Sequence, residues 1–327
     1  MPRANRSARR AVVIITSLAA LFATGATAQS YPQRPIQVVV PTSAGGGVDM
    51  IARTIGQKLT AALGQTIVVD NRPGAGGVIG VALVTKAAPD GYSLLVASIS
   101  HVAVNPSLVR VTFDPVRDLA PVSLIASGPL ILVVHPSVPV TSVKDLIALA
   151  KARKGALNYG SAGTGTTSHV GVELFKSMTQ TDIVHVPFKG NALATTALIS
   201  GEIDVMLNSP TNALPHVRSG RLRALAVGTL ARSSVVPELP TVAEAGVPGF
   251  EADAWYSMLA PAGTPSEIIL RLSGEIAKAV RMPDVQQRLA HEALDPVGST
   301  PAEFGAYLKS ELTKWAGVIK NAKIRSD

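Results

Sequence analysis

Short runs of apolar, β-branched residues alternate along this chain with longer segments in which apolar residues recur every three or four positions. The first pattern predicts strands and the second predicts helices, and their alternation is typical of α/β proteins with mostly parallel sheets. A first series of predicted elements comprises strand Ile36–Val40, helix Asp49–Leu63, strand Thr66–Asp70, helix Val78–Ala88 and strand Ser93–Ala97.

A second series of the same kind follows. It comprises strand Leu130–His135, helix Ser142–Lys151, strand Leu157–Tyr159, helix Ser168–Met178, strand Asp182–Val186, helix Ala192–Ser200 and strands Ile203–Leu207 and Leu222–Val227. The nearly uncharged stretch Leu119–Val134 leads into this series, and the Pro/Gly-rich stretch Val235–Gly249 leads out of it to the apolar run Trp255–Ala260.

These two connections predict two lobes that are joined by a hinge of two crossing segments. We expect lobe I at 29–126 plus 250–327 and lobe II at 127–249. A final helix, with an apolar stripe from Phe304 to Ala322 at three- and four-residue spacing, is expected to pack against the core.

The N-terminus carries a different pattern. Four arginines lie within the first ten residues, the apolar run Ala11–Ala23 follows, and small residues occur at Ala26 and Ala28. This order predicts a secretory signal peptide over residues 1–28, cleaved after Ala28, and therefore a periplasmic protein. The apolar run is shorter than the ~20 residues that a membrane-spanning helix requires. The Arg9-Arg10 pair leaves both the general and the twin-arginine export routes open.

The net charge of the chain has a different interpretation once residues 1–28 are excluded. The full sequence has 327 residues with a net charge of +8, but four of its 30 Lys and Arg lie in the predicted signal peptide. The remaining charge has no basic run, so nucleic-acid binding is not expected. The chain has no cysteine, which excludes thiol catalysis and thiolate metal sites. Its six histidines lack metal-binding spacing, so we expect no metal and no cofactor.

Two glycine-rich loops follow predicted strands and lead into helices. The first is Pro41–Asp49, with three consecutive glycines at 45–47, and the second is Ser161–His169, which also carries several hydroxyls. Glycines let the backbone approach a ligand, and the first amides of a helix form an anion site. The two loops therefore predict a carboxylate site in an interlobe cleft. The alternative is that both are only tight turns, and that Asp49 caps its helix rather than contacting a ligand.

Other polar residues leave two interpretations open. A third loop, Asn71–Gly77, again opens a helix, and its Arg72 would either face the ligand or pair at the surface. Asp204, at the start of a predicted strand, would either orient a ligand or cap a turn. The loops lack the Gly-Lys-Ser/Thr ending of a P-loop and the final glycine of a dinucleotide fingerprint.

Several motifs, taken in order, resemble one family. They are Tyr31-Pro-x-x-Pro-Ile36, Pro41-x-x-x-Gly-Gly-Gly-x-Asp49, Asn71-Arg-Pro-Gly-Ala-Gly-Gly77, Ala88-Pro-Asp-Gly-Tyr92, Val186-Pro-Phe-Lys-Gly190, Leu225-Ala-Val227, Pro240-Thr-Val-Ala-Glu-Ala-Gly246 and Ala260-Pro-Ala-Gly-Thr-Pro265. This set is similar to the tripartite tricarboxylate transporter substrate-binding proteins, known as the Bug family. The resemblance implies a monomeric, two-lobed type II periplasmic receptor of the Venus flytrap kind. Such a receptor binds a small organic acid and presents it to membrane permease subunits or a signalling partner.

Ligand-binding residues follow from the loops and from the resemblance together. The expected set is Thr42, Ser43, Ala44, Gly45, Gly46, Asp49, Ser98, Ser161, Gly163, Thr164, Gly165, Thr166, Ser168, Asp204 and Asn208. The resemblance also shows two departures, because relatives usually carry an aromatic residue at the position of Thr42 and often a tyrosine at the position of Phe188. The loss of a ring at Thr42 would change the preference among similar acids.

Two rival functions belong to other classes. A secreted α/β hydrolase would use Ser161, His169 and Asp204, although Tyr159 stands where a nucleophile elbow requires glycine. The effector half of a transcription regulator would share the two lobes, but it would not explain the predicted signal peptide, and no N-terminal helix-turn-helix is expected.

Overall fold

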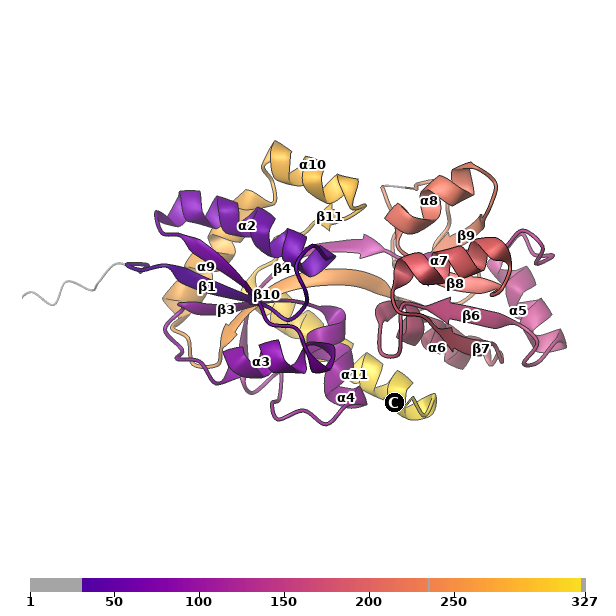
Figure 1. Ribbon diagram of the computed structural model, residues 1–327, viewed down its shortest axis with the longest axis horizontal. Coiled ribbons are helices and arrows are strands. Elements are labelled where there is room, and N and C mark those ends of the chain that lie inside the picture. Colours follow the sequence, from indigo (N-terminus) through magenta and orange to yellow (C-terminus); the bar gives the residue numbers. More distant parts are fainter. Residues whose placement is uncertain (1–30, 235, 325–327) are drawn as a thin grey trace, which may run out of the picture. The chain divides into compact units, whose positions relative to one another are not determined.

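The computed structural model describes residues 31–234 and 236–324, and its helices and strands lie in the compact unit Arg34–Asp327. The predicted signal peptide, residues 1–28, lies outside the described residues. Two sheets organise the unit (Figure 1), one with strand order β11-β4-β10-β3-β1-β2 and the other with order β7-β6-β8-β5-β9. No helix in the described part of the chain is long and apolar enough to cross a membrane.

The first sheet combines strands from both ends of the chain. Its strands are β1 (Ile36–Val40), β2 (Ile67–Asn71), β3 (Ser93–Ser98), β4 (Leu119–Pro129), β10 (Asp253–Pro261) and β11 (Asp295–Pro296). Its helical segments are α2 (Gly47–Leu63), the 3-10 turn η2 (Ala75–Gly77), α3 (Val78–Thr85), the π-turn η3 (Ser100–Val104), α4 (Asn105–Leu108), α9 (Ser266–Ala279), α10 (Pro283–His291) and α11 (Pro301–Asn321).

The second sheet is built from the middle of the chain. Its strands are β5 (Ile131–Val134), β6 (Asn158–Ser161), β7 (Val184–Pro187), β8 (Val205–Asn208) and β9 (Arg223–Val227). Its helices are α5 (Val143–Ala152), α6 (Thr167–Thr179), α7 (Asn191–Ser200) and α8 (Pro210–Arg218). The α/β architecture with two lobes is therefore confirmed, whereas the lobe boundaries stay a prediction.

The sheets are mixed, so the expectation of mostly parallel sheets is wrong. Within each sheet, the strands of the local strand–helix–strand units pair in parallel, as β1 does with β2 and β3, and as β6 does with β7 and β8. The strands that enter or leave a lobe pair antiparallel: β10 lies between β3 and β4, and β5 lies between β8 and β9. A chain that returns to a sheet from the other lobe arrives in the opposite direction.

The two crossing segments are fastened to each other by backbone hydrogen bonds. Gly228 follows β9 and donates its N–H to the carbonyl oxygen of Leu130, at an N–O distance of 2.7 Å. Ala252, which precedes β10, donates to the carbonyl oxygen of Gly228 at 2.9 Å. A Cβ at position 228 would lie 2.2 Å from the Ala252 oxygen, so only glycine fits at this crossing.

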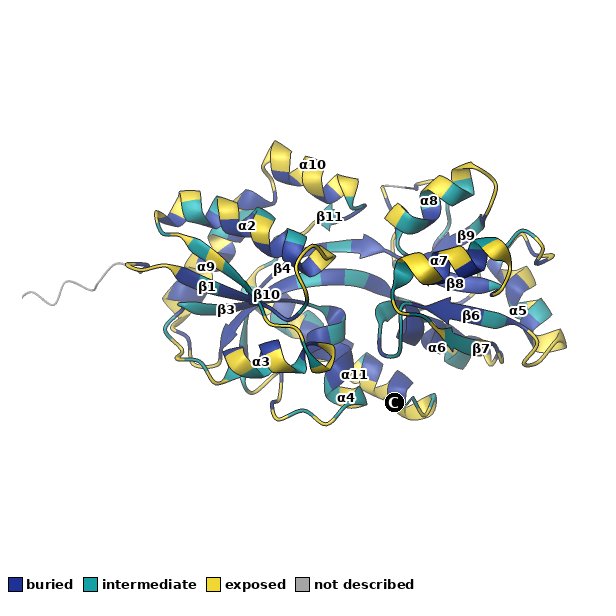
Figure 2. Cartoon of the chain, viewed as in Figure 1, coloured by how far each residue is buried: buried dark blue, intermediate teal, exposed yellow. Residues whose placement is uncertain are grey.

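The alternation along β5 fits its position inside the second sheet, between β8 and β9. Leu132 and Val134 belong to the large apolar cluster that extends to β1 and β3, whereas Ile131 and Val133 belong to a second cluster on the other face. All four side chains are buried, which fits an interior strand that is covered on both faces. Figure 2 shows strands that are mostly buried and helices, such as α10, with exposed outer faces.

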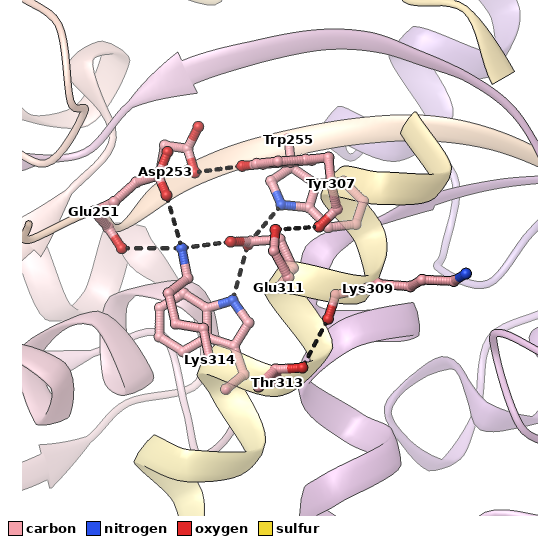
Figure 3. Close-up of polar contacts among 10 residues, drawn as sticks. Glu251, Asp253, Trp255, Tyr307, Lys309, Glu311, Thr313 and Lys314 are labelled. Carbon is pink, nitrogen blue, oxygen red and sulfur yellow. Dashed lines mark hydrogen bonds and ion pairs between the residues drawn. The ribbon is translucent and has the colours of Figure 1, made fainter. Parts of the chain in front are cut away.

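A buried polar cluster joins β10 to the C-terminal helix α11 (Figure 3). The Glu311 carboxylate, 1% exposed, accepts hydrogen bonds from the indole nitrogens of Trp255 at 3.0 Å and Trp315 at 2.9 Å. Lys314 forms an ion pair with Glu311 and another with Glu251, whose Nζ–Oε2 distance is 3.1 Å. Glu251 lies two residues before the start of β10, so this cluster joins the crossing segment to the helix.

Candidate functional site

One cavity, of about 710 Å³, receives loops from both sheets. Its lining residues are Pro41, Thr42, Gly46, Gly47, Val48, Gly74, Gly76, Gly77, Ser98, Ile99, Ser100, His101, Asn105, Ala162, Thr164, Gly165, Thr166, Thr167, Gly190, Asn191, Ala254 and Tyr256. Of these described residues, none is Lys, Arg, Asp or Glu. The cavity is therefore polar and uncharged, and seven of its lining residues are glycines.

Three helices begin at this cavity. The first residues of α2, α6 and α7 line it, together with their N-cap residues Gly46, Thr166 and Gly190. In the described chain, no side chain of these three caps accepts a hydrogen bond from the backbone amides of the first turn. The first amides of a helix have no partner within it, and they carry the positive end of the helix dipole. The cavity is therefore suited to an anion.

The loop before α2 is held by Asp49, in the first turn of that helix. The Asp49 carboxylate accepts hydrogen bonds from the Gly45 amide at 2.9 Å, the Arg53 side chain at 2.9 Å and Asn71 Nδ2 at 3.0 Å. The hydrogen bond from Arg53, together with those from Gly45 and Asn71, outweighs burial and lowers the pKa of Asp49 to about 2. The Asp49 carboxylate therefore holds the loop in place through these hydrogen bonds, while the N-cap residue of α2 is Gly46.

The neighbouring glycines of this loop have different roles. A Cβ at Gly47 would lie 2.7 Å from the hydroxyl of Tyr256, so glycine is needed for that contact. Gly46 has an ordinary φ of −86°, and the nearest atom to a Cβ there would be the carbonyl oxygen of Ser43 at 3.9 Å. Gly46 is thus not required by the packing of the protein, and a side chain there would extend into the cavity.

The third loop, 71–77, forms another part of the wall. Asn105 Nδ2 donates to the carbonyl oxygen of Gly76 at 2.6 Å and thereby joins this loop to α4. The His101 ring packs against Gly77, where a Cβ would lie 2.2 Å from the imidazole Cδ2 atom. His101 is 7% exposed, and burial lowers its pKa to about 4, so the imidazole is neutral at physiological pH.

The second-sheet loop is shaped by hydroxyls that bond within it. Ser168 Oγ accepts from the Ala162 amide at 3.0 Å, and Thr166 Oγ1 donates to the Gly163 carbonyl at 2.7 Å. The Gly165 amide donates to His169 Nδ1 at 3.0 Å. Burial, followed by the charges of its neighbours, lowers the pKa of His169 to about 3, which keeps this nitrogen free to accept.

The cavity brings together six of the fifteen expected residues, from both sheets: Thr42, Gly46, Ser98, Thr164, Gly165 and Thr166. The others are placed around it or away from it. Ser43, Ala44 and Gly45 are exposed in the same loop, while Asp49, Ser161, Gly163 and Ser168 support the two loops from within.

Three further residues lie outside the cavity lining. Asp204 is at the start of β8, where its carboxylate accepts from the Asn158 amide at 2.8 Å, at the strand ends opposite Ser161. Asn208 is fully buried and donates to Thr195 Oγ1 at 2.8 Å. Arg72 forms an ion pair with Asp70 at 2.8 Å, which matches the surface alternative for this arginine.

The hydrolase arrangement is not assembled by these contacts. Ser161 is fully buried, and its Oγ lies 2.7 Å from His185 Nε2. His169 stacks on His185, with ring centroids 4.0 Å apart, and its Nδ1 is occupied by the Gly165 amide. Asp204, at the other end of the strand, bonds to Asn158. Together, these contacts give Ser161, His169 and Asp204 separate structural roles. No metal-holding group of three or more His, Asp or Glu side chains occurs in residues 31–234 and 236–324.

Some cavity residues were absent from the expected set. They are chiefly the start of α7 with Gly190 and Asn191, His101 and Asn105 after β3, and Tyr256 on β10. Gly190 also follows a strand and precedes a helix. The pattern of glycines between a strand and a helix, which identified the other two loops, therefore applies to this loop as well. Tyr256 reaches the cavity only because β10 returns from the second sheet, which no local pattern indicates.

A two-lobed α/β protein with such a cavity belongs to the class of solute-binding proteins. The family model described as "Tripartite tricarboxylate transporter family receptor" matches residues 51–324, and the chain belongs to this family. Its members are periplasmic solute-binding proteins.

Individual relatives agree with this assignment. Protein BugT of Bordetella pertussis is 38% identical over 318 residues, covering 97% of this chain and 98% of BugT. A Rhodopseudomonas palustris protein solved with adipate is 37% identical, with a TM-score of 0.76 over 90% of this chain and 99% of that one. MatC of the same organism, solved with bound malate, is 32% identical, with a TM-score of 0.73 over 88% of this chain and 100% of that one.

Proposed function

We propose that this protein is a periplasmic receptor that binds a small organic carboxylate in the cavity, without altering it chemically. The observation that carries the proposal is the meeting of three helix N-termini, those of α2, α6 and α7, at one uncharged cavity. Adipate and malate in two solved relatives support the choice of a carboxylate.

The physical basis is a set of oriented backbone dipoles. Each helix start presents unpaired N–H groups and a partial positive charge, which suits a carboxylate without a Lys or Arg side chain. We propose Gly46, Gly47, Thr166, Thr167, Gly190 and Asn191 as the backbone cradle, with Thr42, Ser98, Thr164 and Gly165 as further contacts. The remaining expected residues would support this cradle.

The wider setting is part of the same proposal. Residues 1–28 would direct export and be removed, and the lobes 29–126 plus 250–327 and 127–249 would close over the ligand as a monomer. The loaded receptor would present its ligand to permease subunits of a tripartite tricarboxylate-type transporter or to a signalling partner. Family membership supports the transport role.

The substitution Gly46→Val tests this mechanism directly. The Cβ of the valine would meet only the Ser43 carbonyl oxygen, at 3.9 Å, so we expect the fold to be preserved while the side chain blocks access to the α2 amides. Loss of even one charge-assisted hydrogen bond of about 1.5–3 kcal/mol corresponds to a more than about tenfold weaker affinity. Calorimetry with organic acids that stabilise the wild-type protein would measure this change.

Two control variants are available. Gly274→Val lies in α9, where a Cβ likewise meets no neighbour, and Arg72→Ala removes a surface ion pair. We expect both to bind as the wild type does. Affinity that depends on Arg72 rather than Gly46 would contradict the backbone cradle. Failure of every acid in a broad panel to stabilise the folded wild-type protein would contradict the proposed function, because a ligand at 100 times its Kd should add about 2.7 kcal/mol.

A further inference from the structure

Tyr256, on the crossing strand β10, lies where two cavities meet. It lines the cavity of about 710 Å³ described above and also a smaller one of about 200 Å³. Gly47 lines both cavities as well, and the Tyr256 hydroxyl lies 2.7 Å from the place that a Cβ of Gly47 would occupy. The hydroxyl is therefore at the boundary between the two cavities.

This hydroxyl is open to the cavities and has no partner in the protein. Tyr256 is half-buried, and within residues 31–234 and 236–324 its hydroxyl makes no hydrogen bond. Four unpartnered side-chain atoms of these residues are closed off from solvent, and the Tyr256 oxygen is not one of them. A bound molecule can therefore reach it.

The hydroxyl is a hydrogen-bond donor at physiological pH. Burial, followed by the negative charge of Glu292, raises the pKa of Tyr256 above its ordinary value. The phenol therefore keeps its proton well beyond neutral pH. Since no described residue accepts this proton, a ligand oxygen can accept it without competing with the protein.

The strand holds the donor in a fixed place. Tyr256 pairs with Ser98 of β3 on one side and with Ala126 of β4 on the other, so its backbone is fixed within the first sheet. The preceding residue, Trp255, is anchored by its hydrogen bond to Glu311 (Figure 3). A donor that is already positioned loses little freedom when a ligand binds.

The hydroxyl also lies beside the first amide of α2. The amide nitrogen and the Cβ of one residue share a Cα and are about 2.5 Å apart, so the Tyr256 oxygen is within roughly 5 Å of the Gly47 nitrogen. Gly47 is the first residue of α2, and its amide has no partner within the helix. An acceptor oxygen between the two donors can lie about 2.8 Å from each of them.

We infer that Tyr256 is a ligand-binding residue whose hydroxyl donates to the carboxylate held at the start of α2. A carboxylate has two acceptor oxygens and no donor, so it can accept from the Gly47 amide and from the hydroxyl together. This inference rests on the proposed function, because it assumes that a carboxylate occupies the cavity. It adds one side-chain donor to the backbone cradle and makes the crossing strand part of the site.

The substitution Tyr256→Phe is the first test. It removes one oxygen atom and breaks no hydrogen bond within the described residues, so the free energy of unfolding without ligand should stay the same. Calorimetry with malate, succinate, adipate and citrate identifies the acid that the wild-type protein binds most tightly. The affinity of the variant for this acid should be at least about tenfold weaker, as expected when a hydrogen bond to a charged group is lost.

Tyr307→Phe is the matched control. The Tyr307 hydroxyl donates to Asp253 at 3.5 Å in the buried polar cluster, and Tyr307 is not one of the residues that line the cavity. This variant loses a hydroxyl that is bonded inside the protein, whereas Tyr256→Phe loses one that is not. We expect Tyr307→Phe to bind the same acid as tightly as the wild type does.

Gly47→Ala gives a second and independent test. Alanine keeps the amide, but its Cβ would lie 2.7 Å from the Tyr256 oxygen and 3.3 Å from the nearest ring carbon. The methyl group should therefore displace the hydroxyl and weaken binding about as much as Tyr256→Phe does. In the Tyr256→Phe background the overlap with the oxygen is gone, so the double variant should bind about as well as Tyr256→Phe alone.

The outcomes separate this inference from the proposed function. Unchanged affinity in Tyr256→Phe, an equal loss of affinity in Tyr307→Phe, or fully additive losses in the double variant would overturn the role of Tyr256 and leave the carboxylate receptor intact. Failure of every acid to bind the folded wild-type protein would overturn both.

Discussion

The proposed ligand cavity and the buried polar cluster between β10 and α11 differ in whether they contain charged side chains. The cavity is suited to an anion by its helix N-termini, yet none of its described lining residues is Lys, Arg, Asp or Glu. The cluster beside β10 and α11 brings Glu251, Asp253, Glu311 and Lys314 together, and no described cavity-lining residue belongs to it (Figure 3). Charged side chains thus hold the fold together in the cluster, while the proposed binding site relies on oriented neutral dipoles.

This difference has a physical reason. A lysine or arginine in the cavity would need a counterion whenever the ligand leaves, whereas amide dipoles keep their orientation in either state. In the cluster, by contrast, the partners of each charge are permanent. The two regions should therefore respond differently to mutation, pH and salt.

The largest effect is expected for Glu311→Ala. This change removes a carboxylate that is 1% exposed, and it leaves two indole N–H groups without their acceptor and Lys314 with only its contacts to Glu251. Breaking a buried ion pair in this way typically costs about 3–5 kcal/mol. Urea unfolding followed by tryptophan fluorescence would measure the loss in the free energy of unfolding.

The matched control for Glu311 is another Glu–Lys pair at the same helical spacing. Glu275 and Lys278 in α9 lie 2.8 Å apart at the surface, and Glu275→Ala should cost less than about 1 kcal/mol. Similar losses in the free energy of unfolding of the two variants would show that burial does not determine how strongly such an ion pair stabilises the protein.

The next largest effect concerns pH. Asp253 is 7% exposed, and burial, followed by the carboxylates of Glu311 and Glu251, raises its pKa to about 7. The unfolded chain releases this proton near pH 3.9. Between about pH 4 and 7 the folded protein therefore holds a proton that the unfolded chain has lost, and stability falls as the pH rises through this window.

Asp253→Asn should remove this dependence. Relative to the variant, the wild-type protein should lose up to about 4 kcal/mol between pH 4 and pH 8, as a shift of about three pKa units implies. Unfolding curves at several pH values would show it. Parallel pH profiles for the two proteins would mean that Asp253 does not carry this proton.

The smallest effect is expected in the cavity itself. The affinity for an ionised acid should change less than about threefold between pH 6.5 and 8.5, because His101 is already neutral with a pKa of about 4. Since no charged side chain among the described residues lines the cavity, raising the salt concentration should also have little effect. Calorimetry at varied salt and pH measures both, and a steep salt dependence would place a charged side chain at the ligand.

The local pattern predicted most strands and helices of the two series but not the direction of their pairing. The period of apolar residues reports burial of one face, which is why β1, α2 and β5 were placed within a few residues. Parallel or antiparallel pairing depends on the route of the whole chain, so the apolar run Trp255–Ala260 could be seen in the sequence but its antiparallel pairing as β10 could not.

In the candidate site, too, features that depend on the local sequence were predicted and features that depend on the whole fold were not. Glycines before helix starts identified the loops at Gly46 and Gly165, because the chemistry of those turns is local. Asp204 was harder to place, since the end of the strand on which a residue lies decides whether it faces the cavity. Its carboxylate holds Asn158 instead. Whether Thr42 or Asn191 has a partner depends on contacts that only the folded chain defines.

The crossing at Gly228 has a consequence for how this protein can diversify. Backbone meets backbone there without room for a methyl group, so that position has no freedom to vary. Gly46, in contrast, has open space before it, and Thr42 holds nothing through its hydroxyl. Substitutions in the cavity wall should therefore be tolerated by the fold, whereas any side chain at position 228 should disrupt the connection between the two sheets.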